Sequence, residues 1–229
     1  MKTIYNILLF ALILFPVSCD LVNPDEAIPS YIYVTPFQLN TNSNQGTNSS
    51  KITEAWLMVN GDFLGAYALP ALIPILYTGE QTITLEAGIK DNGIAATPEI
   101  YPFYQPFTTK VDLRVDEVDT LRPVIGYRSE ARFAFIENFE DNGHVFRDLR
   151  AGTDFNRIQI VSEGAFEGKS AFIQLDRDNP AVELATVGTY QDLTSKGIRV
   201  YLEVNYKSEA PVIFGVQGFK NGLPGTAIF

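Results

Sequence analysis

Strict alternation of apolar and polar residues recurs along this chain, and it constrains the fold more than any other feature. A period of two places one set of side chains on a buried face of a β-strand and the other set in water. Residues 198–206 show this pattern most clearly, and residues 82–86 repeat it. Residues 55–59 run directly into Asn60-Gly61, a pair typical of tight hairpin turns, and Phe63-Leu64 follows. We therefore predict an all-β protein.

Composition agrees with sheets and allows more than one core. The 229 residues include 16 Phe and 11 Tyr but only 2 Met, a balance that suits half-buried pleated surfaces better than packed helices. With 46% hydrophobic residues, the chain can bury one large core or two small ones. We expect two β-sandwich modules, residues 31–125 and 126–229, after an N-terminal signal helix.

The N-terminus has the pattern of a secretory signal. Lys2 precedes an apolar stretch over residues 4–15, which Pro16 and Asp20 close. A membrane-spanning helix needs about 20 apolar residues, so this stretch is too short to span. We predict a signal peptide over residues 1–18.

Pro16-Val17-Ser18-Cys19 resembles the lipobox of bacterial lipoproteins, in which signal peptidase II leaves a cysteine at the mature N-terminus. The resemblance implies that Cys19 carries diacylglycerol and a further acyl chain, enough for stable membrane anchoring. Cys19 is the only cysteine, so an internal disulfide is excluded. The alternative is an ordinary cleaved signal in which this cysteine is incidental.

Acidic residues follow the cysteine in the predicted linker, residues 19–30. Asp20, Asp25 and Glu26 resemble the export tags that direct lipoproteins of the Bacteroidetes group to the outer face of the outer membrane. Elsewhere, Asp directly after the cysteine implies retention at the inner membrane. A solvated acidic spacer explains the same residues. We expect a lipid-anchored cell-envelope protein at the outer membrane.

The first module resembles a known surface domain over residues 52–90. The carrying segments are residues 59–65, Leu69-Pro70 and residues 78–83, which are similar to the PEGA-type small β-sandwich. The resemblance implies a strand-rich spacer or binding module without chemistry. Within this module, residues 40–50 are polar and predict a mobile loop, and the prolines of residues 101–107 predict an edge or loop.

In the second module, residues 163–175 resemble the early strands of carbohydrate-binding jelly rolls, and the likeness spans residues 133–216. Gly168 permits a tight turn, and Ser170 opens a strand. We also expect strands near residues 131–139, 158–162, 198–206 and 212–216. A jelly roll uses eight strands, whereas the sequence predicts five or six. We expect either a truncated module or a strand supplied in trans.

Several kinds of chemistry find no support. The net charge of -10 argues against nucleic acid, since phosphate binding requires clustered Lys and Arg. His144 is the only histidine, and neither a nucleophile elbow, a zinc-binding cluster nor a phosphate-binding loop is present. We predict that the protein is not an enzyme. A glycoside hydrolase, which needs only two carboxylates in one aromatic-lined cleft, is the remaining catalytic alternative.

Two sets of residues are candidate sites. Acidic residues at two turns could hold a structural calcium ion, because hard cations prefer oxygen ligands, or they could be solvated turn acids. These are Glu140, Asp141, Asp176 and Asp178. Aromatic residues could stack on pyranose rings of an extracellular glycan, or they could be half-buried packing residues. These are Tyr190, Tyr201 and Tyr206.

These observations predict a non-catalytic, lipid-anchored envelope protein whose second module binds glycan. The alternative is a structural or assembly role in which the modules bind other envelope proteins.

Overall fold

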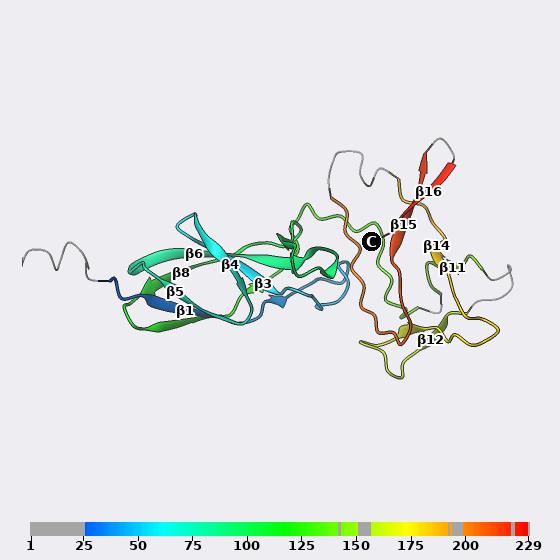
Figure 1. Ribbon diagram of the computed structural model, residues 1–229, viewed down its shortest axis with the longest axis horizontal. Coiled ribbons are helices and arrows are strands. Elements are labelled where there is room, and N and C mark those ends of the chain that lie inside the picture. The colour runs from blue at the N-terminus through cyan, green and yellow to red at the C-terminus, as the bar shows by residue number, and fades with distance from the viewer. Residues whose placement is uncertain are drawn as a thin grey trace, which may run out of the picture. The chain divides into compact units, whose positions relative to one another are not determined.

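The computed structural model describes residues 26–141, 143–150, 157–191, 193, 199–220 and 223–228 (Figure 1). The predicted signal peptide and Cys19 lie outside the described residues. The described chain is all-β, with one 3-10 turn, which confirms the predicted fold class. No helix in this part of the chain is long and apolar enough to span a membrane.

Contacts divide the chain into two compact units. The described part of the first unit comprises residues 26–39 and 50–126, and the second comprises residues 40–49 together with the described residues from 127 onward. The polar segment of residues 40–49 therefore packs with the second unit although it interrupts the first in sequence.

A five-stranded sheet forms one layer of the first unit. Its strands are, in spatial order, β4 (Asp62–Ala68), β3 (Glu54–Val59) and β6 (Gly79–Lys90), with β7 (Pro98–Ile100) and β8 (Phe107–Leu113) both paired to β6. All of these pairings are antiparallel. At the β3–β4 hairpin, Asn60 and Gly61 have φ of 52° and 92°, as the tight turn requires.

A second layer contains β5 (Ala71–Ile75), β1 (Ser30–Val34) and β9 (Val118–Leu121) in that order. β1 is antiparallel to β5 and parallel to β9. Two short strands follow β1 and β9 in sequence. They are β2 (Gln38–Leu39) and β10 (Val124–Ile125), and they form a parallel pair with each other. Ser30 is buried, and its hydroxyl donates to the carbonyl oxygens of Ile75 and Tyr77.

The core of the first unit is built from alternate residues of both layers. Every second side chain of β3 is buried, and in β6 the alternate residues Ile83, Leu85 and Ala87 are buried. Aliphatic side chains fill the core: Ile32, Val34, Leu57, Val59, Ile73, Ile75, Ile83, Leu85 and Leu113. Burial of each stabilises the fold by about 1.5 to 3 kcal/mol. The side chains on the opposite face of the five-stranded sheet are mostly half-buried or exposed.

The second unit contains three short two-stranded ladders among its described residues. They pair β11 (Phe146–Asp148) with β14 (Leu184–Thr186), β12 (Gln159–Val161) with β13 (Ser170–Phe172), and β15 (Gly215–Lys220) with β16 (Leu223–Ile228). Gly168 has φ of 49° in the turn before Ser170, which confirms both expectations for these residues.

A buried ion pair joins segments of the second unit. Arg157 Nε lies 2.5 Å from Asp148 Oδ2, and these side chains are 8% and 1% exposed. Arg157 also donates to the carbonyl oxygen of Ala181 at 2.6 Å. The hydrogen bond to Asp148 raises the pKa of Arg157 above its ordinary value. Because the pair is withdrawn from water, loss of either partner leaves an uncompensated charge.

Two predicted strands of the second unit, over residues 131–139 and 198–206, are wrong. Residues 131–139 and the described residues 199–206 form no strand, and the strand predicted near residues 212–216 begins at Gly215, the first residue of β15. Val200, Leu202 and Val204, predicted to be buried, are 48%, 52% and 45% exposed. The physical reason is that residues 199–206 pair with no neighbouring strand, so neither side of the segment is covered, and Glu203 and Asn205 are exposed as well.

Two hydrogen bonds fix the polar side of the 199–206 segment. Glu203 accepts hydrogen bonds of 3.0 and 3.1 Å from the buried hydroxyl of Tyr127. Asn205 donates to the Ser49 hydroxyl at 2.8 Å.

Candidate functional site

An aromatic pair occupies the open face of the five-stranded sheet. Alternation along β3 places Trp56 on the side opposite to buried Ala55 and Leu57. The Trp56 ring stacks on Phe63 of β4, with ring centroids 5.4 Å apart and an interplanar angle of 29°. Phe63 is 55% exposed, so the pair presents an apolar ring to solvent.

A glycine on the neighbouring strand makes room for the indole. Gly88 of β6 lies opposite Glu54 of β3 and Ile100 of β7. A Cβ atom at Gly88 would lie 3.0 Å from Trp56 Cδ1 and Nε1, closer than ordinary contacts allow. The absence of a side chain at this position lets the indole lie directly on the sheet.

The turn between β6 and β7 forms the far side of the site. It contains the 3-10 turn η2 (Asp91–Gly93), in which Asn92 and Gly93 have positive φ. The backbone N–H of Asp91 donates to the Thr97 carbonyl oxygen at 3.0 Å, and the Thr97 hydroxyl donates to the Asp91 carbonyl oxygen at 3.2 Å. These bonds fix the base of the turn.

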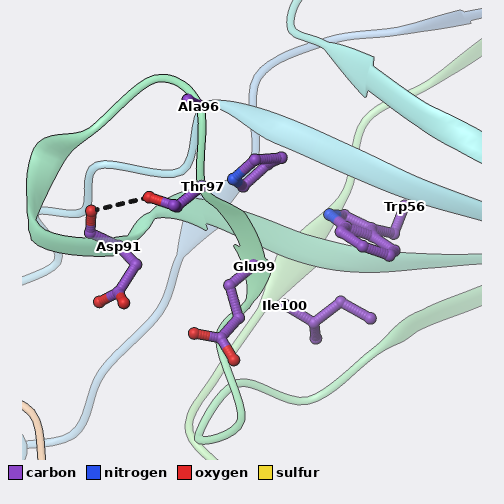
Figure 2. A pocket seen from close by; sticks show the side chains of 7 residues that line it. Trp56, Asp91, Ala96, Thr97, Glu99 and Ile100 are labelled. Atoms are coloured by element: carbon purple, nitrogen blue, oxygen red, sulfur yellow. Dashed lines mark hydrogen bonds between the residues drawn. The ribbon is translucent and has the colours of Figure 1, made fainter.

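An open cleft of about 540 Å³ lies between this turn and the indole. Its lining residues are Trp56, Asp91, Ala96, Thr97, Pro98, Glu99 and Ile100. Figure 2 shows Trp56 and Ile100 at one side of the view and Asp91 at the other, with Glu99 between them. The cleft thus combines an aromatic wall with two carboxylates and contains no basic lining residue.

Two polar groups of the cleft lack protein partners. The Nε1–H of Trp56 is buried and has no acceptor among the described residues. Within the same part of the chain, no group donates to the Asp91 carboxylate. The Trp56 Nε1–H packs against Gly88, and a buried donor without a partner costs about 1 to 3 kcal/mol.

Sequence reasoning did not identify this cleft. The sequence predicts the strands over residues 55–59 and 82–86, which lie in β3 and β6. The two signals become a site only through the register of β6, which brings the turn and β7 beside β3. Trp56 on the polar face of an alternating strand was the one sequence signal that could have pointed to it.

The predicted glycan-binding tyrosines are not brought together by any recorded contact among the described residues. Tyr190 stacks on Phe135 at 5.2 Å and is half-buried. The Tyr201 hydroxyl accepts a 3.4 Å hydrogen bond from Arg199. Tyr206 is 65% exposed and contacts Phe214 edge-on at 5.1 Å. Each ring has a separate aromatic or polar neighbour.

The first two predicted calcium ligands, Glu140 and Asp141, lie in different surroundings. Glu140 Oε1 accepts the Lys169 backbone N–H at 2.7 Å and fills the space beside Gly168. Asp141, which follows it, is exposed.

The second pair lies in a turn of its own. Asp176 Oδ1 accepts the backbone N–H groups of Asp178 and Asn179 at 2.9 and 2.7 Å, and Asp178 is exposed. Across the part of the chain that the structure describes, no group of three or more His, Cys, Asp or Glu residues is arranged to hold a metal ion.

Comparison with known proteins gives no relative. No protein-family model, curated protein or solved structure matches the chain.

Proposed function

We propose that this protein is a lipid-anchored, non-catalytic protein of the cell envelope, at the outer membrane, that binds extracellular glycan. The cleft beside Trp56 is the observation that supports glycan binding best. We assign the glycan contact to this cleft in the first unit rather than to the tyrosines of the second, because the cleft gathers its groups in one place.

The chemistry of the cleft suits a sugar. A pyranose ring has apolar C–H faces and a rim of hydroxyl groups, so it needs an aromatic surface together with donors and acceptors. Trp56 supplies the aromatic surface of the lining, and Phe63 stacks on it. The Asp91 carboxylate lies in the lining and can accept hydrogen bonds from hydroxyl groups.

The lipid anchor rests on the sequence around Cys19. Its position after an apolar stretch of signal-peptide length supports acylation, and the acidic residues behind it support the outer membrane. Anchoring suits a glycan-binding role, because a tethered module holds a polysaccharide at the cell surface.

Binding of the mature chain to a glycan array in detergent tests the proposal. We expect retention of at least one glycan and a loss of binding in Phe63→Ala, which removes the exposed ring of the aromatic pair. Phe166→Ala is the matched control, since Phe166 is a 64% exposed phenylalanine of the second unit. No retained glycan, or equal losses in both variants, contradicts the proposal.

The pairing of Asp91 and Glu99 in one cleft also resembles what the glycoside hydrolase alternative requires. Incubation of a retained glycan with the protein, followed by measurement of new reducing ends, separates the two. We expect no release above the rate without protein, and release that is lost in both Asp91→Asn and Glu99→Gln would establish catalysis.

A second candidate function is assembly with other envelope proteins. The exposed apolar side chains of Val200, Leu202 and Val204 favour it, because exposed apolar surface can mark an interaction site. Crosslinking in intact cells tests this role. A partner captured by the parent protein and lost in Leu202→Ser, together with a blank glycan array, would favour assembly.

A further inference from the structure

We propose that the outer face of the sheet formed by β5, β1 and β9 lies against the membrane that anchors the protein. This inference rests on the proposed function, because the lipid on Cys19 provides the tether. The features that carry it are an apolar face without charged side chains, the contrast with the charged outer face of the other sheet, and the short stretch of chain between Cys19 and β1.

Six side chains form this outer face, in two rows that cross the three strands. The first row is Pro74, Tyr31 and Val118, and the second row is Leu72, Tyr33 and Thr120. Leu72 and Val118 are 57% and 55% exposed. None of the six side chains is charged. The acidic residue of β9, Asp119, lies opposite buried Ile32 and is therefore on the other side of the sheet.

The outer face of the five-stranded sheet has a different character. Alternation with the buried residues of β3, β6 and β8 places five charged side chains on it: Glu54, Glu80, Glu86, Lys110 and Asp112. The two sheets of a sandwich pack through their inner faces, so a surface that covers one outer face leaves the other in water. Transfer of charged groups out of water is costly, so a lipid surface accepts the uncharged face and not the charged one.

The chemistry of the uncharged face suits the boundary between lipid and water. Tyrosine is enriched at membrane interfaces, because its ring is apolar and its hydroxyl group reaches the polar headgroups. Tyr31 and Tyr33 occupy the middle strand of this face, and aliphatic side chains flank them. Leu76, the residue after β5, is 70% exposed and adds to the apolar surface beside β5.

The tether decides between a membrane and a partner from solution. Ten residues, 20–29, separate Cys19 from Ser30, the first residue of β1. At full extension this stretch places Ser30 at most about 40 Å from the Cys19 sulfur. A short tether raises the effective concentration of the second contact to about the millimolar range, so a weak apolar contact is enough. The membrane is always within this reach, whereas a partner from solution is not.

A fluorophore at position 72 of the mature, lipid-modified chain tests the inference. Diacylglycerol occupies the sulfur of the only cysteine, so Leu72→Cys introduces the one free thiol for labelling. The protein is reconstituted in phosphatidylcholine vesicles with and without a lipid that carries a quencher near its headgroup. We expect the quencher lipid to reduce the emission from position 72. Thr108→Cys is the matched control, because Thr108 is exposed on the charged face, and its label should keep its emission.

A second substitution tests the apolar character of the contact. Val118→Asp, added to the labelled Leu72→Cys protein, places a charge on the face and should abolish the quenching at position 72. Val187→Asp is its control, since Val187 is a 63% exposed valine of the second unit. Thermal unfolding verifies the fold of each variant. A rise in salt from about 0.1 to about 1 M should leave the quenching in the Leu72→Cys protein unchanged, because salt screens charges and not apolar contacts.

The outcomes separate this inference from the proposed function. If mass spectrometry finds the lipid on Cys19 and the quencher lipid leaves position 72 unchanged, the membrane contact is overturned and the anchor stands. Equal quenching at positions 72 and 108 also overturns it, because neither face is then preferred. Disulfide formation between two Leu72→Cys chains, without quenching by lipid, assigns the face to a second copy and overturns it as well. An unmodified Cys19 overturns both the anchor and the membrane contact.

Discussion

The indole of Trp56 lies directly on Gly88 of the adjacent strand, and a Cβ atom at Gly88 would lie 3.0 Å from indole atoms Cδ1 and Nε1. This contact sets the depth of the aromatic wall of the cleft. It also makes Gly88 a position from which the wall can be moved without altering any lining residue.

The first prediction concerns this contact. Gly88→Ala should push the indole outward and weaken glycan binding, because the added methyl group overpacks the site at a cost of about 1 to 3 kcal/mol. Trp56 is the only tryptophan, so a change in its fluorescence emission reports the movement.

Gly143→Ala is the control for that experiment, since a Cβ atom there meets nothing within 4 Å. An unchanged emission spectrum and unchanged affinity in Gly88→Ala would show that the glycine does not position the indole.

The second prediction concerns the buried pair of Arg157 and Asp148. Arg157→Gln should lower the unfolding temperature of the second unit by at least about 5 °C, because the Asp148 carboxylate stays buried without its cation. Differential scanning calorimetry measures the change. The double variant Arg157→Met with Asp148→Leu should lose less than Arg157→Gln, since it leaves no buried charge.

The matched control is Arg150→Gln, which breaks a 3.5 Å ion pair with Glu183 whose side chains are 59% and 58% exposed. Exposed pairs contribute little, so the unfolding temperature should hardly change. Similar decreases in Arg150→Gln and Arg157→Gln would contradict the special role of the buried pair.

The third prediction compares two leucines that sequence alternation alone would place in a core. Leu57 is fully buried and Leu202 is 52% exposed. Leu57→Ala should reduce the free energy of unfolding by about 2 to 5 kcal/mol, whereas Leu202→Ala should stay within about 0.5 kcal/mol. Chemical denaturation measures both. A large loss in Leu202→Ala would mean that residues 199–206 are buried after all.

The fourth prediction concerns the anchor. The mature protein should begin at lipid-modified Cys19 and should fractionate with membranes. The Cys19→Ala variant should instead be found in the soluble fraction after export. Mass spectrometry of the mature N-terminus and fractionation of the cells measure these outcomes. An unmodified thiol, or a different mature N-terminus, would show that the protein is not anchored through a lipid on Cys19.

The contrast between the two leucines shows what alternation can and cannot predict. Leu57 and Leu202 lie in segments with the same period of two, and the hairpin turn at Asn60-Gly61 fixed the register of the first. The second segment has no such turn, and its polar residues Glu203 and Asn205 bind within their own unit. Alternation predicts that one face is apolar, but strand pairing with residues distant in sequence decides whether that face is buried.

The candidate site was hidden for a similar reason. Trp56 and Asp91 are 35 positions apart, and neither carries a motif. Their proximity follows from strand pairing, which places the end of β6 beside both β3 and β7. Sequence analysis predicted the strands over residues 55–59 and 82–86, but the cleft depends on their register with each other and with β7.

The most direct test of glycan binding in this cleft is a titration of the protein with a retained glycan, followed through the fluorescence of Trp56. Since Trp56 lines the cleft and is the sole tryptophan, its emission should change saturably, with the same half-saturation that calorimetry gives. A glycan that binds by calorimetry without any change in emission would show that the cleft is not its site.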